Sequence, residues 1–242
     1  MPRLQNYQKE LDYSYAPGLF PSLEVIKKQP HLVLRVLLSS KLVETPAIND
    51  MQSLCKTHGI RTEVADRALA RLSGKENVYV AAVFEKQDGE LSKDLRHLVL
   101  HHPSDKGNIG TMLRTALGFN FQNIAIIAPA ADYYDPHVIR ASMGALFALN
   151  IKTFSDFESY RSEFSRHTLY PFMLEGSSSL EEAANTAGKS YSLIMGNEAT
   201  GLPDEFSKIG HSVRIEHSGQ IDSLNLSVAA GIGMYVFNAS KL

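Results

Sequence analysis

The sequence predicts an α/β protein in which helices cover a mostly parallel sheet on both faces. Short apolar runs of strand length alternate with segments of helical spacing from residue 15 almost to the end of the chain. At 44% hydrophobic, the 242 residues can bury a large core. Some apolar runs, such as residues 124–128 (IAIIA), are continuous, which is typical of strands buried on both faces of a parallel sheet.

A small α/β unit is predicted first, over residues 15–84. Ile48, Met51, Leu54 and Cys55 share one face of a helical pattern, which Gly59 then ends. The predicted strands of this unit are 32–38, 60–64 and 78–84, and its predicted helices are 48–58 and 64–72.

Residues 85–95 (EKQDGELSKDL) separate this unit from the rest of the chain. They are polar and rich in charged side chains, which favours a linker. A solvated hairpin or helix inside a single domain is the alternative. The predicted division is a first domain at 1–88, a linker at 89–95 and a second domain at 96–242.

The second domain shows the stronger alternation of strands and helices. A proline lies near the first turn of the helix predicted at 136–149. Ser155, followed by Glu158 three residues later, is predicted to cap a helix within 154–164. The predicted strands are 97–102, 124–128, 169–174, 191–195 and 213–216, and the other predicted helices are 109–119, 179–186 and 224–238.

Composition narrows the classes of function. A net charge of −2 lacks the basic excess of many nucleic-acid-binding proteins, so such binding would need a local basic face. Cys55 is the one cysteine, so we expect a small buried hydrophobe in a reducing compartment. The first residues lack the apolar core of a signal peptide, and the apolar run at 228–237 is too short to cross a membrane. We therefore expect a soluble, cytoplasmic protein.

Several familiar chemistries do not fit. Residues 196–201 (GNEATG) have the glycine spacing of a phosphate-binding loop, but Leu202 and Pro203 replace its lysine and hydroxyl residue. The pair His101–His102 has no cysteine near it, and adjacent strand residues point to opposite faces, so a metal site is not expected. Ser223 is not in the glycine-flanked turn of a hydrolase nucleophile.

Three short segments instead place small or uncharged polar residues at strand–helix junctions. They are 108–114 (NIGTMLR), 196–202 (GNEATGL) and 223–227 (SLNLS). In α/β proteins, ligands bind at such junctions. Taken singly, each has a structural reading: Arg114 as a surface or ion-pair arginine, and Asn225 as a helix cap.

Taken together, the segments resemble the SpoU (TrmH-like) RNA ribose 2′-O-methyltransferases of the SPOUT superfamily. The residues that match that family's three motifs are Asn108, Gly110 and Arg114, then Gly196, Asn197, Glu198, Gly201 and Leu202, then Ser223, Leu224, Asn225 and Ser227. Residues 135–147 are similar to a further family stretch between the first two motifs. The resemblance covers residues 95–242. It extends more loosely to the first domain, which resembles a ribosomal-protein-like substrate-binding domain, with 18–20 and 78–86 as the similar segments.

This resemblance implies a C-terminal methyltransferase domain with a deep trefoil knot whose loops hold the cofactor S-adenosyl-L-methionine. It also implies an RNA substrate, rRNA more than tRNA, selected with the help of the first domain. It implies a homodimer in which two chains build one site, and no metal. The near-neutral charge predicts modest non-specific RNA binding through a salt-sensitive patch. A knotted RNA-binding factor without catalysis and a base-methylating relative are the alternatives.

The resemblance also assigns site residues. The implied catalytic set is Arg114, Asn108, Glu198, Ser223 and Asn225, with Asn108 and Glu198 holding Arg114 in position. The implied cofactor-binding set is Met195, Gly196, Asn197, Gly201, Leu202, Ile215, Ser223, Leu224 and Asn225. Arg114 and Arg140 are the implied RNA-binding residues, although a structural ion pair is an equal alternative for Arg140. Because guanidinium stays protonated, we expect Arg114 to hold a substrate phosphate and stabilise a developing alkoxide.

The chain departs from the family pattern at one place. Family members usually have Ile-Pro-Met several residues before the serine, whereas this chain has Ile215, Glu216 and His217. If backbone atoms of this segment contact the adenine, the change is tolerable. If side chains pack the ligand, cofactor affinity suffers, which favours the non-catalytic alternative.

Overall fold

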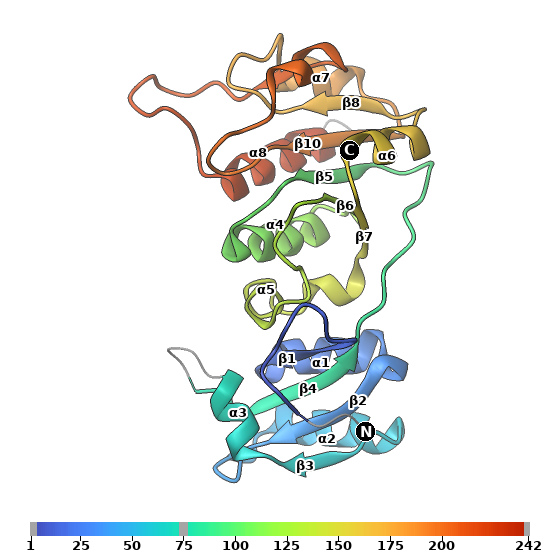
Figure 1. Cartoon of the computed structure of the whole chain (residues 1–242), viewed down its shortest axis with the longest axis vertical. Helices are drawn as coiled ribbons and strands as arrows, with labels where there is room; N and C mark the ends of the chain where they lie inside the picture. Colours follow the sequence, from blue (N-terminus) through green and yellow to red (C-terminus); the bar gives the residue numbers. More distant parts are fainter. Residues whose placement is uncertain (1–3, 73–76, 240–242) are drawn as a thin grey trace. The chain divides into compact units, whose positions relative to one another are not determined.

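A computed structural model describes residues 4–72 and 77–239 of the chain (Figure 1). The contacts divide the chain into two compact units. The first unit runs to Gln87 and also contains Asp132–Ala148, and the second comprises Asp88–Ala131 and Leu149–Leu242. Residues 132–148 therefore pack with the first unit, although the predicted sequence boundaries place them in the second domain. The functional division into an RNA-binding domain, a linker and a methyltransferase domain stays a prediction.

The first unit is built on a mixed four-stranded sheet in the order β1-β4-β2-β3. Strand β4 (Val80–Glu85) pairs antiparallel with β1 (Tyr13–Pro17) and with β2 (Val33–Leu38), and β2 pairs parallel with β3 (Thr62–Val64). Its helices are α1 (Leu19–Lys28), α2 (Pro46–Thr57), α3 (Asp66–Leu72) and α5 (Pro136–Ala141), followed by a 3-10 turn at Ala145–Ala148. The three strands predicted here are confirmed, and so are both helices. The sequence analysis missed β1 and α1.

Side chains from both parts of the first unit hold it together. The Asp132 carboxylate accepts a short hydrogen bond from the Tyr7 hydroxyl and pairs with Lys86 Nζ at 3.4 Å. Ser14 Oγ donates to the Tyr134 carbonyl at 2.5 Å. Cys55 is buried, as expected.

The second unit contains a parallel five-stranded sheet in the order β7-β6-β5-β10-β8. Every neighbouring pair is parallel, as the continuous apolar runs predicted. Every residue of β5, β6 and β10 is buried, which explains why these strands read as apolar runs. The strands are β5 (His97–His101), β6 (Asn123–Ile127), β7 (Asn150–Phe154), β8 (Thr168–Pro171) and β10 (Tyr191–Met195).

Helices cover both faces of this sheet, as predicted. The face that carries Val99 and Ile194 packs against side chains of α6 (Phe157–Glu163). The opposite face carries Tyr191, whose ring lies 5.4 Å from that of Phe237 in α8 (Leu226–Ala239). Helix α8 also packs against α4 (Lys106–Gly118). The remaining elements are α7 (Leu180–Thr186), a 3-10 turn at Asp204–Lys208, and the short parallel pair β9 (Ser178–Ser179) and β11 (Val213–Arg214).

Several predicted boundaries are wrong for local reasons. The helix predicted at 136–149 ends at Ala141, because Met143 and Gly144 take positive φ angles of 54° and 82°. Asp156, and not Ser155, caps α6, and β7 occupies residues that were assigned to no strand. Helix α4 begins at Lys106, three residues before the predicted start, because Asp105 caps it. Among the described residues, no helix is long and apolar enough to cross a membrane.

Candidate cofactor and catalytic site

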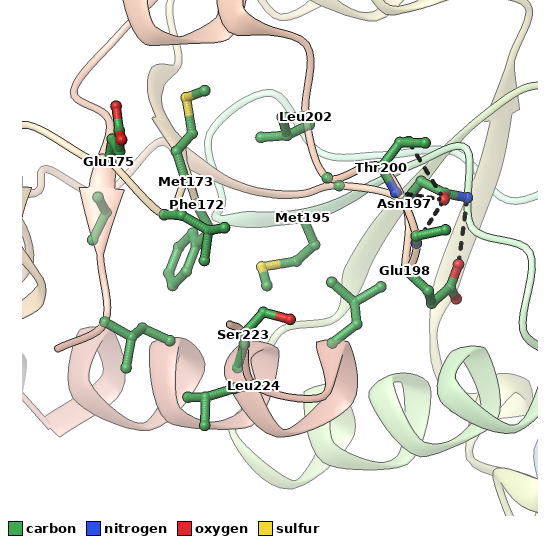
Figure 2. A pocket seen from close by; sticks show the side chains of 18 of the residues that line it. Phe172, Met173, Glu175, Met195, Asn197, Glu198, Thr200, Leu202, Ser223 and Leu224 are labelled. Atoms are coloured by element: carbon green, nitrogen blue, oxygen red, sulfur yellow. Dashed lines mark hydrogen bonds between the residues drawn. The ribbon is translucent and has the colours of Figure 1, made fainter. Parts of the chain in front are cut away.

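A cavity of about 830 Å³ opens at the carboxyl ends of β8 and β10 in the second unit (Figure 2). Four segments line it: 172–175 after β8, 195–207 from the last residue of β10 onward, 213–217 around β11, and 223–229 at the start of α8. This position agrees with the rule that ligands bind beyond the carboxyl ends of parallel strands. Of the residues expected to bind the cofactor, those in its lining are Met195, Gly196, Asn197, Gly201, Leu202, Ile215, Ser223 and Leu224.

The loop 196–202 closes on itself through its backbone. Asn197 N donates to the Gly201 carbonyl at 3.1 Å, and Gly201 N donates back to the Asn197 carbonyl at 2.9 Å. Gly201 has a φ of 68°, which favours glycine. A Cβ on Gly196 would lie 2.3 Å from the Gly201 carbonyl carbon, so the backbone approach requires glycine there. Leu202 is only 8% exposed, and it packs in the core as well as facing the cavity.

The Asn197 side chain braces the same loop and ties it to the end of β5. Its oxygen accepts hydrogen bonds from Ala199 N at 2.9 Å and from Thr200 N at 3.3 Å (Figure 2). Its nitrogen donates to the His102 carbonyl at 2.7 Å. The amide therefore shapes the cavity wall through backbone groups and is largely committed to the protein.

Glu198 reaches the loop between β5 and α4. Its carboxylate accepts hydrogen bonds from Ser104 N at 3.0 Å, Ser104 Oγ at 2.8 Å and Asp105 N at 3.1 Å. Partial burial opposes ionisation, but the hydrogen bonds from Ser104 and Asp105 outweigh it and lower the pKa of the Glu198 carboxyl. The carboxylate is therefore ionised at neutral pH and serves as an acceptor for this loop.

Arg114 is exposed on α4, and no hydrogen bond or ion pair holds its side chain within the part of the chain that the structure describes. The expectation that Asn108 and Glu198 hold Arg114 directly is therefore not met in this structure. Asn108 Oδ1 instead accepts a hydrogen bond from Asn225 Nδ2 at 3.1 Å. Arg114 is left free to contact a ligand.

Asn225 performs the capping role that its position suggested, and it also joins two helices. Its Oδ1 accepts hydrogen bonds from Ser227 N at 2.9 Å, Ser227 Oγ at 2.7 Å and Val228 N at 3.3 Å. Asn225 does not line the cavity, in contrast to Ser223 and Leu224 beside it. Asn108 and Arg114 do not line it either, so the cavity and the α4 residues form two adjoining parts linked by Asn225.

The segment that departs from the family pattern contributes two lining residues. Ile215 and His217 face the cavity, whereas Glu216 lies outside its lining and pairs with Arg214 at 3.3 Å. His217 Nδ1 donates to the Ile215 carbonyl at 3.0 Å. The departure therefore places an imidazole in the cavity wall and leaves the apolar Ile215 in place.

Sequence reasoning missed further residues of the site. Phe172 and Met173 line the cavity from the loop after β8, and the Phe172 ring rests on α8 so closely that a Cβ on Gly233 would lie 2.5 Å from it. Ser104 and Asp105 were not singled out, although an aspartate three residues before Asn108 is an N-cap signal. Arg140 lies on α5 of the first unit and is not in the cavity lining.

The two histidines at the end of β5 stack with ring centroids 3.8 Å apart. Burial, and then the neighbouring His102, lower the pKa of His101 to about 4. Over residues 4–72 and 77–239, no group of three histidine, cysteine or acidic side chains has the geometry of a metal site.

Sequence comparison identifies a family and individual relatives of this chain. The sequence model described as the SpoU rRNA Methylase family matches residues 96–235. The 23S rRNA (guanosine(2553)-2′-O)-methyltransferase RlmP of Bacillus subtilis (strain 168) is 25% identical over 216 residues, which cover 88% of this chain and 84% of that protein. An uncharacterized tRNA/rRNA methyltransferase of Synechocystis is 29% identical over 144 residues, 57% of this chain but only 51% of its own length.

The fold has relatives among solved structures. The AdoMet-bound rRNA methyltransferase from Sinorhizobium meliloti superposes with a TM-score of 0.79. The match covers 96% of this chain and 88% of that one, at 23% sequence identity. The likeness extends over both units of the chain.

Proposed function

This chain belongs to the SpoU rRNA Methylase family, and on that premise we propose that it transfers a methyl group from S-adenosyl-L-methionine to a ribose 2′-hydroxyl of RNA. Ribosomal RNA is the proposed substrate ahead of tRNA, since the relative from Bacillus subtilis is named for a 23S rRNA nucleotide. The observation that carries the proposal is the meeting of the three motifs. Beside one cavity, segment 108–114 is hydrogen-bonded to segment 223–227 through Asn108 and Asn225, and it is connected to segment 196–202 through Asp105.

The cavity has the size and chemistry for this cofactor. A volume of about 830 Å³ lies within the usual range of ligand sites. Met173, Val213 and Ile215 offer an apolar surface for an adenine ring, and the glycines at 196 and 201 let the backbone approach a ligand closely. The charged lining residues are Glu175, Glu198 and Asp204, with no lysine or arginine, which suits a cationic sulfonium. When bound, the cofactor supplies a methyl carbon that its sulfonium makes electrophilic.

The protein's own residues contribute alignment and charge stabilisation. Arg114 cannot accept a proton, so we assign it to a substrate phosphate and to the alkoxide that develops at the ribose oxygen. The phosphate that Arg114 holds is the proposed acceptor of the hydroxyl proton. Ser223, at the cavity wall, and Asn225, between α8 and α4, orient the two reactants, because in-line displacement depends mainly on geometry.

The proposal includes a trefoil knot in the second unit. Two glycines there, at positions 176 and 210, let two backbone segments pass so closely that a Cβ would lie 2.4 and 2.3 Å from the other segment. Such close passages support tightly interwoven loops. We also propose a homodimer through α8, because Val228 and Tyr235 expose 51% and 59% of their surface on a largely apolar helix.

The first domain, at 1–88, is proposed to select the RNA, with 89–95 as linker and Arg140 as a further RNA contact. This selection would rest on RNA shape, loops and 2′-hydroxyls. A cytoplasmic location, where rRNA is accessible, completes the proposal.

The test is transfer of a labelled methyl group to RNA from cells that lack this protein, followed by nuclease digestion and mass spectrometry. The expected product is a 2′-O-methylnucleoside at a defined rRNA position. A methyl group on a base would identify the base-methylating alternative. The absence of both transfer and calorimetric binding of S-adenosyl-L-methionine would favour the non-catalytic alternative that Glu216 and His217 suggest.

A further inference from the structure

The loop 196–202 is connected to helix α4 through Ser104 and Asp105, which the family motifs do not include. Glu198 belongs to the loop that lines the cavity, and three of its hydrogen-bond donors lie in the short segment between β5 and α4. Two of the donors are backbone groups of Ser104 and Asp105, and the third is the Ser104 hydroxyl. The position of this segment is therefore set from the cavity side.

Asp105 connects this segment to α4. Its Oδ1 accepts a hydrogen bond from Asn108 N at 2.6 Å, which makes Asp105 the N-cap of the helix. An N-cap holds the first turn in helical conformation, and losing it lets that turn fray. The first turn of α4 contains Asn108.

Asn108 carries the connection to the last helix. Its side-chain oxygen accepts the hydrogen bond from Asn225, whose own oxygen caps α8. If the first turn of α4 frays, Asn225 loses this partner. One continuous series of hydrogen bonds thus runs from Glu198 through Asp105 and Asn108 to Asn225 at the start of α8.

We propose that Asp105 and Ser104 are positioning residues for methyl transfer: held by Glu198, they fix the first turn of α4 and, through Asn108, the start of α8. The proposal rests on the proposed function for its kinetic consequence. It also makes a structural claim that does not depend on activity. Neither residue lines the cavity, so both act through the residues that they hold.

The kinetic test compares Asp105→Ala with Asp105→Asn in the full-length protein. The alanine variant should lower kcat about tenfold, because small misplacements of reacting groups cost that much or more. The KM for RNA and the dissociation constant of S-adenosyl-L-methionine should stay within about twofold, since the cavity lining is untouched. Asparagine keeps the capping oxygen and should restore most of kcat. Ser104→Ala removes one of the three donors that this segment offers to Glu198 and should lower kcat about threefold.

Asp156→Ala is the matched control. Asp156 caps α6 in the same unit with the same geometry, its Oδ1 accepting from Ser159 N at 2.7 Å. Both alanine variants should lower the melting temperature by a similar amount, but only Asp105→Ala should lower kcat. Equal kcat values for the two variants would overturn the proposal, and so would an asparagine variant as slow as the alanine variant.

Hydrogen–deuterium exchange tests the connection whether or not the protein transfers methyl groups. Asp105→Ala should speed exchange of the amides in the first turn of α4 and also in the first turn of α8, and Asp156→Ala should change neither. Faster exchange confined to α4 would refute the link to α8. If the wild-type protein transfers no methyl group to any RNA, the proposed function fails, while this measurement still decides the structural claim.

Discussion

The two ends of the five-stranded sheet both carry polar side chains, but one end is sealed and the other is open. At the amino end, His97 begins β5 and its register partner Ser192 lies in β10, and both are completely buried. At the carboxyl end, β10 leads into the loop that lines the cavity, and β5 leads into residues 102–105, which hydrogen-bond to that loop. Polar side chains are therefore part of the core at one end of the sheet and part of the candidate site at the other.

The sealed end is a hydrogen-bonded network of His97, Tyr160, Ser192 and His167. His97 Nε2 donates to the Ser92 carbonyl at 2.8 Å, so the neutral ring accepts at Nδ1 from the Tyr160 hydroxyl, 2.9 Å away. Ser192 Oγ lies 2.7 Å from the Tyr160 oxygen and 3.0 Å from His167 Nδ1. Each of these buried polar side chains has hydrogen-bond partners, and a buried network of this kind makes the core rigid.

At the open end, only part of the polar side chains have partners. Glu198 and Asn197 form hydrogen bonds with loop residues, whereas Arg114 remains free among the described residues. The partners of a polar residue at a strand end, and not its type, therefore decide whether it stabilises the fold or faces a ligand. Substitutions at the open end should change rate or binding, and those at the sealed end should change stability.

Arg114→Ala should have the largest effect. Removing a group that stabilises developing negative charge typically lowers kcat about 10² to 10³-fold. Because Arg114 is exposed and outside the cavity lining, calorimetric affinity for S-adenosyl-L-methionine and the melting temperature should stay near wild type. Arg166→Ala is the control, since Arg166 is an exposed arginine with only a long ion pair to Asp94 at 3.8 Å. Loss of cofactor binding in Arg114→Ala would contradict its assigned role.

His97→Ala should show the reverse behaviour. It removes the acceptor of the Tyr160 hydroxyl proton and the donor to the Ser92 carbonyl, and it creates a cavity, so it should lower the free energy of unfolding by about 2 to 4 kcal/mol. Activity per folded molecule should not change. His217→Ala at the open end should cost less than about 0.5 kcal/mol, because His217 is exposed. Denaturant titration measures both, and equal losses would erase the contrast between the two ends.

Gly233→Ala tests the cavity wall with a smaller expected effect. The added methyl group would push the Phe172 ring away from α8, and the ring lines the cavity. We expect affinity for S-adenosyl-L-methionine to fall about tenfold with little change in melting temperature, since the ring is the movable end of a side chain. In Gly231→Ala the nearest atom would be Thr115 Cγ2 at 3.6 Å, an ordinary contact. Similar affinities in the two variants would show that Phe172 does not shape the binding space.

The pH dependence of stability should follow the sealed end. Burial, and then the charge of His167, lower the pKa of His97 to about 4, and burial also lowers the pKa of His167. The unfolded chain therefore binds more protons below the ordinary histidine pKa of about 6.5, so stability is complete above that pH and declines as the pH falls toward 4. At pH 5.5, His97 should account for a loss on the order of 1 kcal/mol. A His97→Ala protein should lose less stability between pH 7 and 5.5 than wild type, and an equal loss would assign the effect elsewhere.

Strands with strong local patterns were predictable. The strand predicted at 191–195 coincides with β10, because a short, mostly apolar run of strand length is typical of a buried strand in a parallel sheet. Strand β1 was missed, since its sequence YSYAP alternates weakly and ends in proline. The helix at 136–149 was predicted too long. Hydrophobic periodicity does not show that the chain turns at Gly144, where it passes so close to Pro21 and Glu24 that a Cβ would clash.

The candidate site was predictable as a set of residues and not as an arrangement. The expected cofactor residues line one cavity, with Asn225 as the exception. The expected contact between Glu198 and Arg114 is absent from the described hydrogen bonds. Ser104 and Asp105, which donate hydrogen bonds to Glu198, lie more than 90 residues away from it in the chain, which no local pattern encodes.

The fold class, the buried parallel strands and the three ligand-loop segments could be predicted from the sequence, because they depend on local periodicity, backbone freedom and side-chain chemistry. Which polar residues are enclosed and which are open depends instead on contacts between segments that are distant in the chain. His97 and Ser192 lie near the start of their strands in a closed network, whereas Asn197 and Glu198 follow β10 in the cavity lining, and nothing in their immediate sequence separates the two cases. The distinction comes from the segments that the fold brings to each end, with Tyr160 and His167 at one end and residues 102–105 at the other.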